Sequence, residues 1–251
     1  MSTVLIVLGF LAIPAAFLAF KLFQNHQTSV TRTASTCGDI AHAGGTLDPA
    51  AWFIGPDLSH IGPPPDWGNK SPGMPPHPEP ASPGFILNVP VGVNLPLGTG
   101  DKLDSLAFKH GPLTGKKQIA MSYRVELSAG AELLAVPEVD PAARYKARMT
   151  VYFQRDGDDW STEGKMEAYR WYYTGEEIYL EPGDHELVVP LDRGWTATQT
   201  STMASNPPGF KNAIANTCCV GFGFGGNEVG RIHGMRATGP AKITVTKFEV
   251  S

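Results

Sequence analysis

Alternation of large apolar and polar side chains constrains the fold of this chain more than any other feature. In residues 118–127, QIAMSYRVEL, one side of an extended backbone carries Ile, Met, Tyr, Val and Leu, while the other carries Ala, Ser, Arg and Glu. This period of two is typical of an antiparallel strand with one face in a core and one face in water. Similar runs recur later in the sequence, at 147–154, 168–173, 185–191, 220–226 and 241–250.

Turn-forming sequences separate these runs, among them DGDD, TGEE, EPGD and ATGP. The chain of 251 residues holds 28 glycines and 22 prolines, so long helices are not expected in most of it. One short helix is predicted at 206–218, with Asn206 as its N-cap, prolines in its first turn, and Phe210 and Ile214 on its apolar side.

The pattern predicts an all-β fold, an antiparallel two-sheet sandwich over residues 101–251. With 42% hydrophobic residues the chain has enough apolar surface for a sizeable core. We expect this core to contain Met121, Tyr123, Val125, Val151, Phe153, Val189 and Val245.

A Pro/Gly-rich segment, residues 46–100, precedes the predicted sandwich and holds more than half of the prolines. Such a composition favours extended, polyproline-like structure. The segment also carries large apolar residues, including Trp52, Trp67 and Phe85, which are too many for a free linker. We therefore expect a strap packed on the surface of the main domain, and a proline-rich ligand for another protein is the alternative.

The N-terminus is the most apolar part of the chain. Residues 4–20 contain no charged side chain, and with the residues up to 23 the run matches the thickness of a bilayer core. No basic residue precedes the run and no Ala-x-Ala site follows it closely, so residues 1–23 are predicted to be an uncleaved transmembrane anchor rather than a signal peptide or a core helix. Residues 24–45, rich in Thr, Ser, Gln and Gly, read as a polar tether.

The orientation of this anchor follows from two opposing signals. Lys21 and Arg32 would hold the C-terminal side in the cytoplasm. The long β-rich body is instead typical of exported modules, and we expect a single-pass protein whose main domain is extracytoplasmic, on the periplasmic side. Cysteine usage leaves the compartment open, because Cys37 can pair with Cys218 or with Cys219, or all three thiols can stay reduced.

Charge and motif content exclude several functional classes. The formal net charge is −4 and no long basic run occurs, which argues against a nucleic-acid partner. No GxSxG elbow and no CxxC or HxxxH spacing is present, so neither a nucleophile elbow nor a metal site is predicted. The stretch GFGFGGNEVG is not followed by a helical pattern, so it is read as a strand and turn rather than a phosphate loop.

Five acids lie between two of the predicted strands, at positions 156, 158, 159, 163 and 167. We expect them to form the solvated tip of a long hairpin, because paired catalytic carboxylates need a fixed separation across a cleft. DGDD also lacks the ligand spacing of a calcium loop. No cofactor is predicted, and a structural calcium ion elsewhere stays open.

The strands on either side of the acids carry the candidate binding residues. If Trp171 points into the core, the alternation directs the neighbouring aromatic, amide and guanidinium side chains outward. Tyrosine, tryptophan and arginine are favoured at protein interfaces, and they also suit sugar rings and hydroxyls. We predict an exposed contact face for a partner or a glycan, made by Tyr152, Gln154, Trp160, Arg170 and Tyr172.

The order of these elements resembles the galactose-binding-like jelly rolls, a fold that many carbohydrate-binding modules share. The resemblance covers roughly residues 85–251 and rests on the strand order and on the closing strand in GPAKITVTKFEV. It implies a jelly-roll-like sandwich and allows a sugar ligand. The chain also resembles uncharacterised bacterial exported proteins, which imply no function.

Three functional hypotheses follow from these observations. The first is a non-catalytic, membrane-anchored accessory or structural subunit, bound to integral membrane proteins and held in the lipid bilayer by residues 4–23. The second is a membrane-anchored carbohydrate-binding module that takes a polysaccharide. The third, a divergent glycan hydrolase, has the least support because no catalytic pair is apparent.

Overall fold

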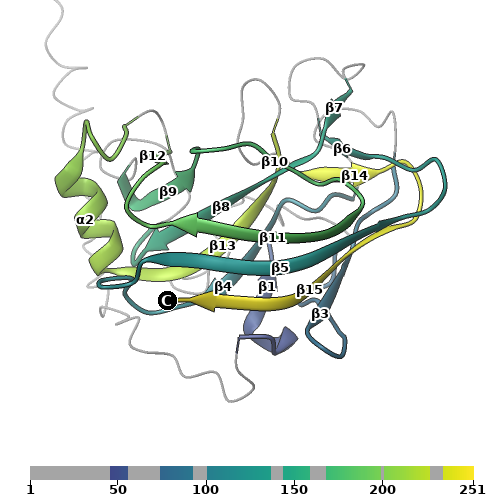
Figure 1. The fold of residues 1–251 in the computed structure, drawn as a ribbon, viewed down its shortest axis with the longest axis horizontal. Coiled ribbons are helices and arrows are strands. Elements are labelled where there is room, and N and C mark those ends of the chain that lie inside the picture. The colour runs from purple at the N-terminus through teal and green to yellow at the C-terminus, as the bar shows by residue number, and fades with distance from the viewer. Residues whose placement is uncertain are drawn as a thin grey trace, which may run out of the picture. The chain divides into compact units, whose positions relative to one another are not determined.

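Two antiparallel sheets face each other across an apolar core (Figure 1). The structure is a computed structural model. All pairings between its named strands are antiparallel, and α2 is the one α-helix of the described part. The prediction of an all-β antiparallel sandwich with one short helix is therefore confirmed. The residues that the structure describes are 46–55, 74–92, 101–136, 144–158, 168–198, 201–226 and 234–251.

The larger sheet has seven strands, and its central strand β13 pairs with β4 on one side and with β8 on the other. Strand β10 (Ile178–Tyr179) extends it by pairing with the beginning of β8. The remaining strands, in spatial order, are β1 (Trp52–Ile54), β4 (Ser105–Lys109), β13 (Thr217–Gly225), β8 (Arg148–Arg155), β9 (Arg170–Tyr173) and β12 (Trp195–Ala197).

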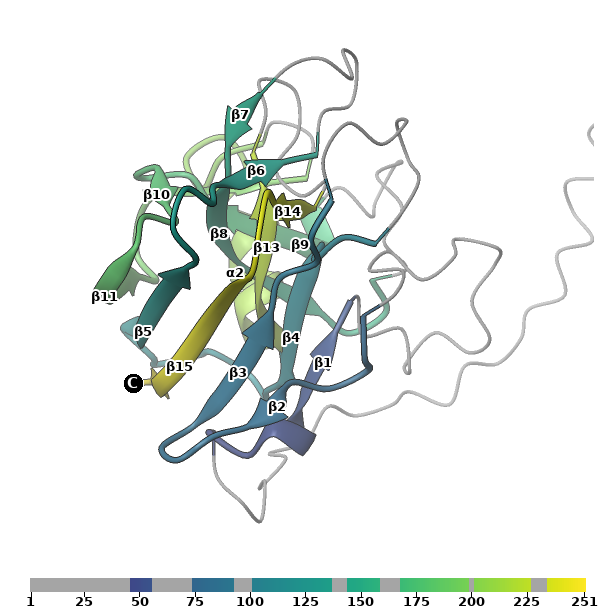
Figure 2. The same ribbon diagram turned by 90° about the vertical axis from the view of Figure 1, so that its right-hand side faces the viewer.

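The second sheet has five strands, and a small three-stranded sheet lies apart from it (Figure 2). The five strands, in spatial order, are β11 (Gly183–Pro190), β5 (Gln118–Leu127), β15 (Ala241–Val250), β3 (Phe85–Asn88) and β2 (Glu79–Pro80). The small sheet is β14 (Met235–Ala237), β6 (Leu133–Ala135) and β7 (Tyr145–Lys146).

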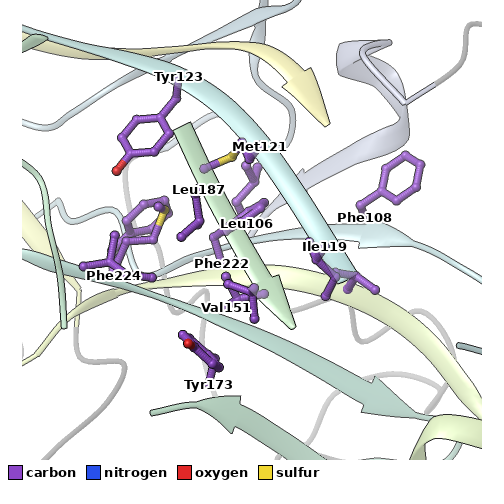
Figure 3. Packing of buried hydrophobic residues seen from close by; sticks show 14 of the residues in the cluster. Leu106, Phe108, Ile119, Met121, Tyr123, Val151, Tyr173, Leu187, Phe222 and Phe224 are labelled. Atoms are coloured by element: carbon purple, nitrogen blue, oxygen red, sulfur yellow. The ribbon is translucent and has the colours of Figure 1, made fainter. Parts of the chain in front are cut away.

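The alternation in the sequence sets the two faces of each sheet. Strand β5 spans the predicted residues, and its inward side chains meet those of β8, β13 and β4 from the opposite sheet (Figure 3). The predicted core is confirmed. Each of its members is at most 4% exposed, namely Met121, Tyr123, Val125, Val151, Phe153, Val189 and Val245.

The described parts of the Pro/Gly-rich segment, residues 46–55 and 74–92, do not form the surface strap that the composition predicts. Its described parts supply strands to both sheets, and Trp52 is fully buried between them. The Trp52 ring has its centroid 5.1 Å from that of Phe85 and 4.9 Å from that of Phe108. Burial of these large side chains in the core stabilises the fold more than a position on the surface would. Residues 46–92, where described, therefore belong to the sandwich itself.

The predicted helix is confirmed as α2 (Pro207–Ala215). The Asn206 side chain accepts a hydrogen bond from the backbone N–H of Gly209 at 3.0 Å, which satisfies one of the free donors of the first turn. Phe210 is buried, and its ring centroid lies 5.0 Å from that of Trp171 and 5.8 Å from that of Phe153. The helix therefore packs on the inward side chains of β8 and β9.

The predicted anchor, residues 1–23, and the predicted tether, residues 24–45, lie outside the described residues. Within the described part, no helix is long and apolar enough to cross a membrane.

We expect Phe153→Ala to lower the free energy of unfolding by about 3–5 kcal/mol, because a fully buried ring is removed and the surrounding core closes only partly. Urea denaturation of the purified chain measures this. The control is Thr244→Ala on β15, because the Thr244 side chain lies on the outward side of the five-stranded sheet. This substitution should leave the free energy of unfolding unchanged. Equal effects of the two substitutions would contradict the inward placement of Phe153.

Candidate functional site: a buried polar cluster and an open groove

Strands β8 and β9 bring four of the five predicted contact residues together. Tyr152 is paired with Tyr172, and Gln154 with Arg170, so that all four side chains project from the same side of the larger sheet. The inward neighbours Phe153 and Trp171 form the pair between them, as the alternation predicts. The fifth predicted residue, position 160, lies outside the described residues.

The prediction that these side chains form an exposed contact face is wrong. Tyr152 and Gln154 are 0% exposed, Arg170 is 2% exposed and Tyr172 is 5% exposed. The period of two identifies the side of the sheet that each residue occupies, but it does not reveal whether that side faces water. Here both sides of the sheet are buried at these positions.

Tyr152 is buried because small residues on the neighbouring strands leave room for its ring. A Cβ atom added to Gly221 would lie 2.5 Å from the Tyr152 ring, so the ring passes directly over the glycine backbone. Gly221 is paired with Ala107 on its other side, and Ala107, Tyr152, Tyr172 and Cys219 pack as a second, smaller apolar cluster. The ring therefore lies flat across the sheet.

Asp158 completes a buried polar cluster beside these rings. Its Oδ2 atom accepts a hydrogen bond from Gln154 Nε2 at 2.9 Å and one from Arg170 Nη1 at 3.3 Å. The side chains of Asp158 and Arg170 are 0% and 3% exposed, so the ion pair is removed from water. The expectation of a wholly solvated acidic tip is thus wrong for Asp158, whose carboxylate is held by partners on β8 and β9.

The electrostatics of this cluster keep Arg170 charged. Burial by itself lowers the pKa of the Arg170 guanidinium, but the attraction of Tyr172 and Asp158 outweighs it, so the pKa is raised above its usual value. A buried cation that lacked such partners would cost several kcal/mol, roughly, in lost hydration. Asp158 therefore has a structural role in compensating Arg170.

The rest of the acidic stretch shows no metal site in its described part. Asp156 is half-buried at the turn, and positions 159, 163 and 167 lie outside the described residues. Arg155 stacks on Tyr169, with its guanidinium carbon 3.9 Å from the ring centroid. Among the residues that the structure describes, no three His, Cys, Asp or Glu side chains are grouped to hold a metal ion.

The two adjacent cysteines of β13 have different states. Cys218 is disulfide-bonded, whereas Cys219 is a buried, reduced thiol. The third cysteine of the sequence, at position 37, lies outside the described residues. The sequence leaves open whether Cys218 forms a disulfide or stays reduced. The structure excludes the reduced state of Cys218.

An open groove of about 860 Å³ lies elsewhere, on residues that the sequence does not single out. Strands β7, β8 and β10 and the end of β13 supply its walls. Three cations, two carboxylates and two tyrosines line it together with one glycine, and they are Arg144, Tyr145, Lys146, Arg148, Glu177, Tyr179, Glu181 and Gly226.

The polar groups of the groove hold one another in place. Lys146 Nζ lies 2.9 Å from Glu181 Oε1, and Arg148 forms an ion pair with Glu177. The Tyr179 hydroxyl donates a hydrogen bond of 2.7 Å to Glu177 Oε2, which raises the pKa of Tyr179 and keeps the phenol neutral. Arg148 also donates from Nε and Nη2 to the carbonyl of Gly226, at 3.2 and 2.9 Å.

Sequence reasoning missed this groove because its residues come from short strands that show no clear alternation. The motifs YKAR and EEIYLE are far apart in the chain, and only the pairing of β10 with β8 brings Tyr179 next to Arg148. The mixture of Arg, Lys, Glu and Tyr in two short runs was the available signal. This mixture of residues does not distinguish a groove from an ordinary solvent-exposed sheet edge.

In comparisons with known proteins, the chain matches no family model and no curated protein.

We expect Arg170→Ala to lower the free energy of unfolding by about 3–5 kcal/mol, because it leaves the buried Asp158 carboxylate without its cation. Chemical denaturation measures the change. The double variant Asp158→Leu/Arg170→Met should recover part of the loss, since it removes both charges. The control is Asp192→Asn, which breaks an ion pair whose two side chains are 77% and 75% exposed. If Arg170→Ala cost no more than this control, the cluster would not have the structural role assigned to it.

Proposed function

We propose that this protein is a non-catalytic, membrane-anchored accessory subunit whose sandwich docks on a larger membrane protein complex. The observation that carries the proposal is strand β11, an edge strand of the five-stranded sheet whose outer side no other described strand occupies. Two further features agree with it, namely the apolar N-terminal run in the sequence and the disulfide at Cys218.

Strand β11 offers a long, regular edge. It pairs with β5 over all eight of its residues without a register shift, and no other described strand pairs with its outer side. It lies at the outer side of the ribbon in Figure 2. Natural edge strands are usually short, bulged or covered, because their free N–H and C=O groups attract other strands. A partner segment can add to such an edge through main-chain hydrogen bonds.

The side chains of β11 also suit a non-obligate interface. Val188 is 51% exposed and is one of three exposed large apolar side chains among the described residues. Asp184 and Glu186 are exposed on the same side of the strand, and Asp184 is bound to Arg124 by two hydrogen bonds of 2.6 Å. An apolar residue within a polar rim is the usual composition of such interfaces.

The non-catalytic role is supported by the state of the acids that a glycan hydrolase would need. Two carboxylates on opposite sides of a cleft are required for that chemistry. Asp158 is buried against Gln154 and Arg170, and Glu177 and Glu181 are each paired with a cation. These contacts favour a structural role for the three carboxylates over a catalytic one.

An extracytoplasmic position is part of the proposal. A disulfide persists in oxidising compartments such as the periplasm and is rare in the cytosol, so the bond at Cys218 favours a body outside the cytoplasm. A single-pass anchor at residues 1–23 would then place the sandwich beside other membrane proteins. The resemblance to galactose-binding-like jelly rolls is likewise a proposal, supported by the two facing antiparallel sheets.

We expect Val188→Lys to abolish co-purification of the partner subunits from detergent-solubilised membranes, because a charge on the edge strand opposes the addition of another strand. Native gel electrophoresis with mass spectrometry measures the assembly. Thr244→Lys, which adds the same charge on the central strand β15 of the same sheet, is the matched control and should keep the complex. A Val188→Lys chain that still co-purified at full stoichiometry, or a wild-type chain that migrated alone, would contradict the proposal.

A further inference from the structure

Alternate main-chain groups of strand β11 point toward the side of the sheet that no described strand occupies. The backbone N–H of Leu191, directly after the strand, donates a hydrogen bond of 2.8 Å to the carbonyl of Lys117. Residues that bond to the neighbouring strand and residues that do not alternate along an antiparallel pair. The odd-numbered residues of β11 therefore bond to β5, while the N–H and C=O groups of Asp184, Glu186 and Val188 point to the open edge.

Pro190 limits the length of this open edge. It is the next residue in the outward-pointing series, but it has no N–H group, so it can accept a hydrogen bond from a partner and cannot donate one. A proline at the end of an edge strand restricts further pairing. The edge therefore suits a short extended segment, no longer than the eight residues of β11.

The three residues that open their main chain also expose their side chains, on the outer face of the five-stranded sheet. In an added strand, the side chain directly opposite each of them would lie close enough to interact with it. Val188 is 51% exposed and would be covered best by a β-branched or aromatic side chain. The side chains of β11 thus restrict the sequence of the partner segment.

The charge of the edge is concentrated on Glu186. Both carboxylate oxygens of Asp184 accept hydrogen bonds of 2.6 Å from Arg124, so this acid already has its cation. Glu186 is exposed, lies opposite Ser122 on β5, and forms no ion pair with any residue that the structure describes. Opposite charges facing each other across two strands are stabilising, and like charges are destabilising. A lysine or arginine opposite Glu186 is therefore favoured in the partner, and an acid is disfavoured.

The inward side of β11 restricts the position between these two. Leu187 belongs to the core and is 7% exposed, so the partner residue opposite it would lie at the margin of the core and should be apolar. All pairings between the named strands are antiparallel, and we expect the same direction for the partner. The partner segment then meets Val188 first, Leu187 second and Glu186 third.

We propose that β11 binds an extended segment of the partner subunit in which two apolar residues precede a lysine or arginine, the three lying opposite Val188, Leu187 and Glu186. This inference rests on the docking function proposed above, and it names the class of partner that the edge selects. The main-chain groups supply hydrogen bonds to any extended segment, whereas Glu186 and Val188 provide the selectivity.

The test uses two fluorescein-labelled peptides, TVVVKTT and TVVVETT, which differ only in the residue opposite Glu186. Fluorescence anisotropy measures their binding to the full chain in detergent. We expect the lysine peptide to bind about threefold more tightly or better, because one peptide places an opposite charge and the other a like charge across from Glu186. The preference should shrink at high salt, since this pair is exposed to solvent.

Charge reversal on the protein tests the assignment to Glu186. Glu186→Lys should invert the preference, and Glu186→Gln should remove it. The matched control is Glu249→Lys, which makes the same change of charge at an exposed carboxylate on β15, a strand that is paired on both sides. This control should keep the preference of the wild type, and thermal melts should show that every variant is folded.

The proposal is overturned if the wild type binds neither peptide or binds both equally. It is also overturned if Glu186→Lys keeps the wild-type preference, or if Glu249→Lys inverts the preference to the same degree. The docking function fails separately. Loss of co-purification in Val188→Lys without any peptide preference would leave docking intact and contradict only the basic partner, whereas a wild-type chain that migrates alone contradicts docking itself.

Discussion

Burial on both sides of the seven-stranded sheet decides which surfaces of this protein are open to a ligand. On the inward side, Phe153 and Trp171 contact the core and helix α2, as an ordinary sandwich requires. On the other side, Tyr152 lies over Gly221, and the Arg170–Asp158 pair is closed off from water. At these positions the sheet contributes stability and offers no exposed face.

Recognition then falls to the edges and ends of the sandwich. Strand β11 has an outer side that no described strand occupies, and the groove beside β10 holds ordered polar groups around an exposed Tyr179. The two places differ in chemistry, because the edge offers main-chain groups to another strand, while the groove offers charged side chains and an aromatic ring.

The contrast between the two polar clusters is physical. The Arg170–Asp158 pair has lost its hydration, so breaking it strands a charge in the interior. The Lys146–Glu181 pair is largely exposed, at 72% and 54%, so solvent screens it and it contributes little to stability. Similar residue types therefore contribute much to stability in one place and little in the other.

The sequence predicted the sandwich well where one periodic signal controlled the structure. The limits of β5 and β15, the cap of α2 at Asn206 and the inward residues of β8 follow from local patterns. The site was predicted less well. Alternation brought Tyr152 and Arg170 to the same side of the sheet, but burial of that side depends on small residues such as Gly221 on a strand distant in sequence.

The Pro/Gly-rich segment shows a second limit of the same kind. Its composition indicates extended backbone, which is correct for β1 and β3, but not the sheet to which that backbone pairs. Trp52 and Phe85 are ordinary apolar residues until the pairing of β1 with β4 and of β3 with β15 brings them together. Contacts between segments distant in sequence thus determine which sheet each of these strands joins, and local patterns do not reveal this.

Hydroxyl-radical footprinting of the tyrosines tests the central claim most directly, because it reads in one experiment which aromatic surfaces meet water. Burial on both sides of the sheet at β8 and β9 predicts slow modification of Tyr152 and Tyr172, and the exposure of Tyr179 predicts its rapid modification. Rapid modification of Tyr152 and Tyr172 in the folded chain, with Tyr179 protected from the start, would contradict it.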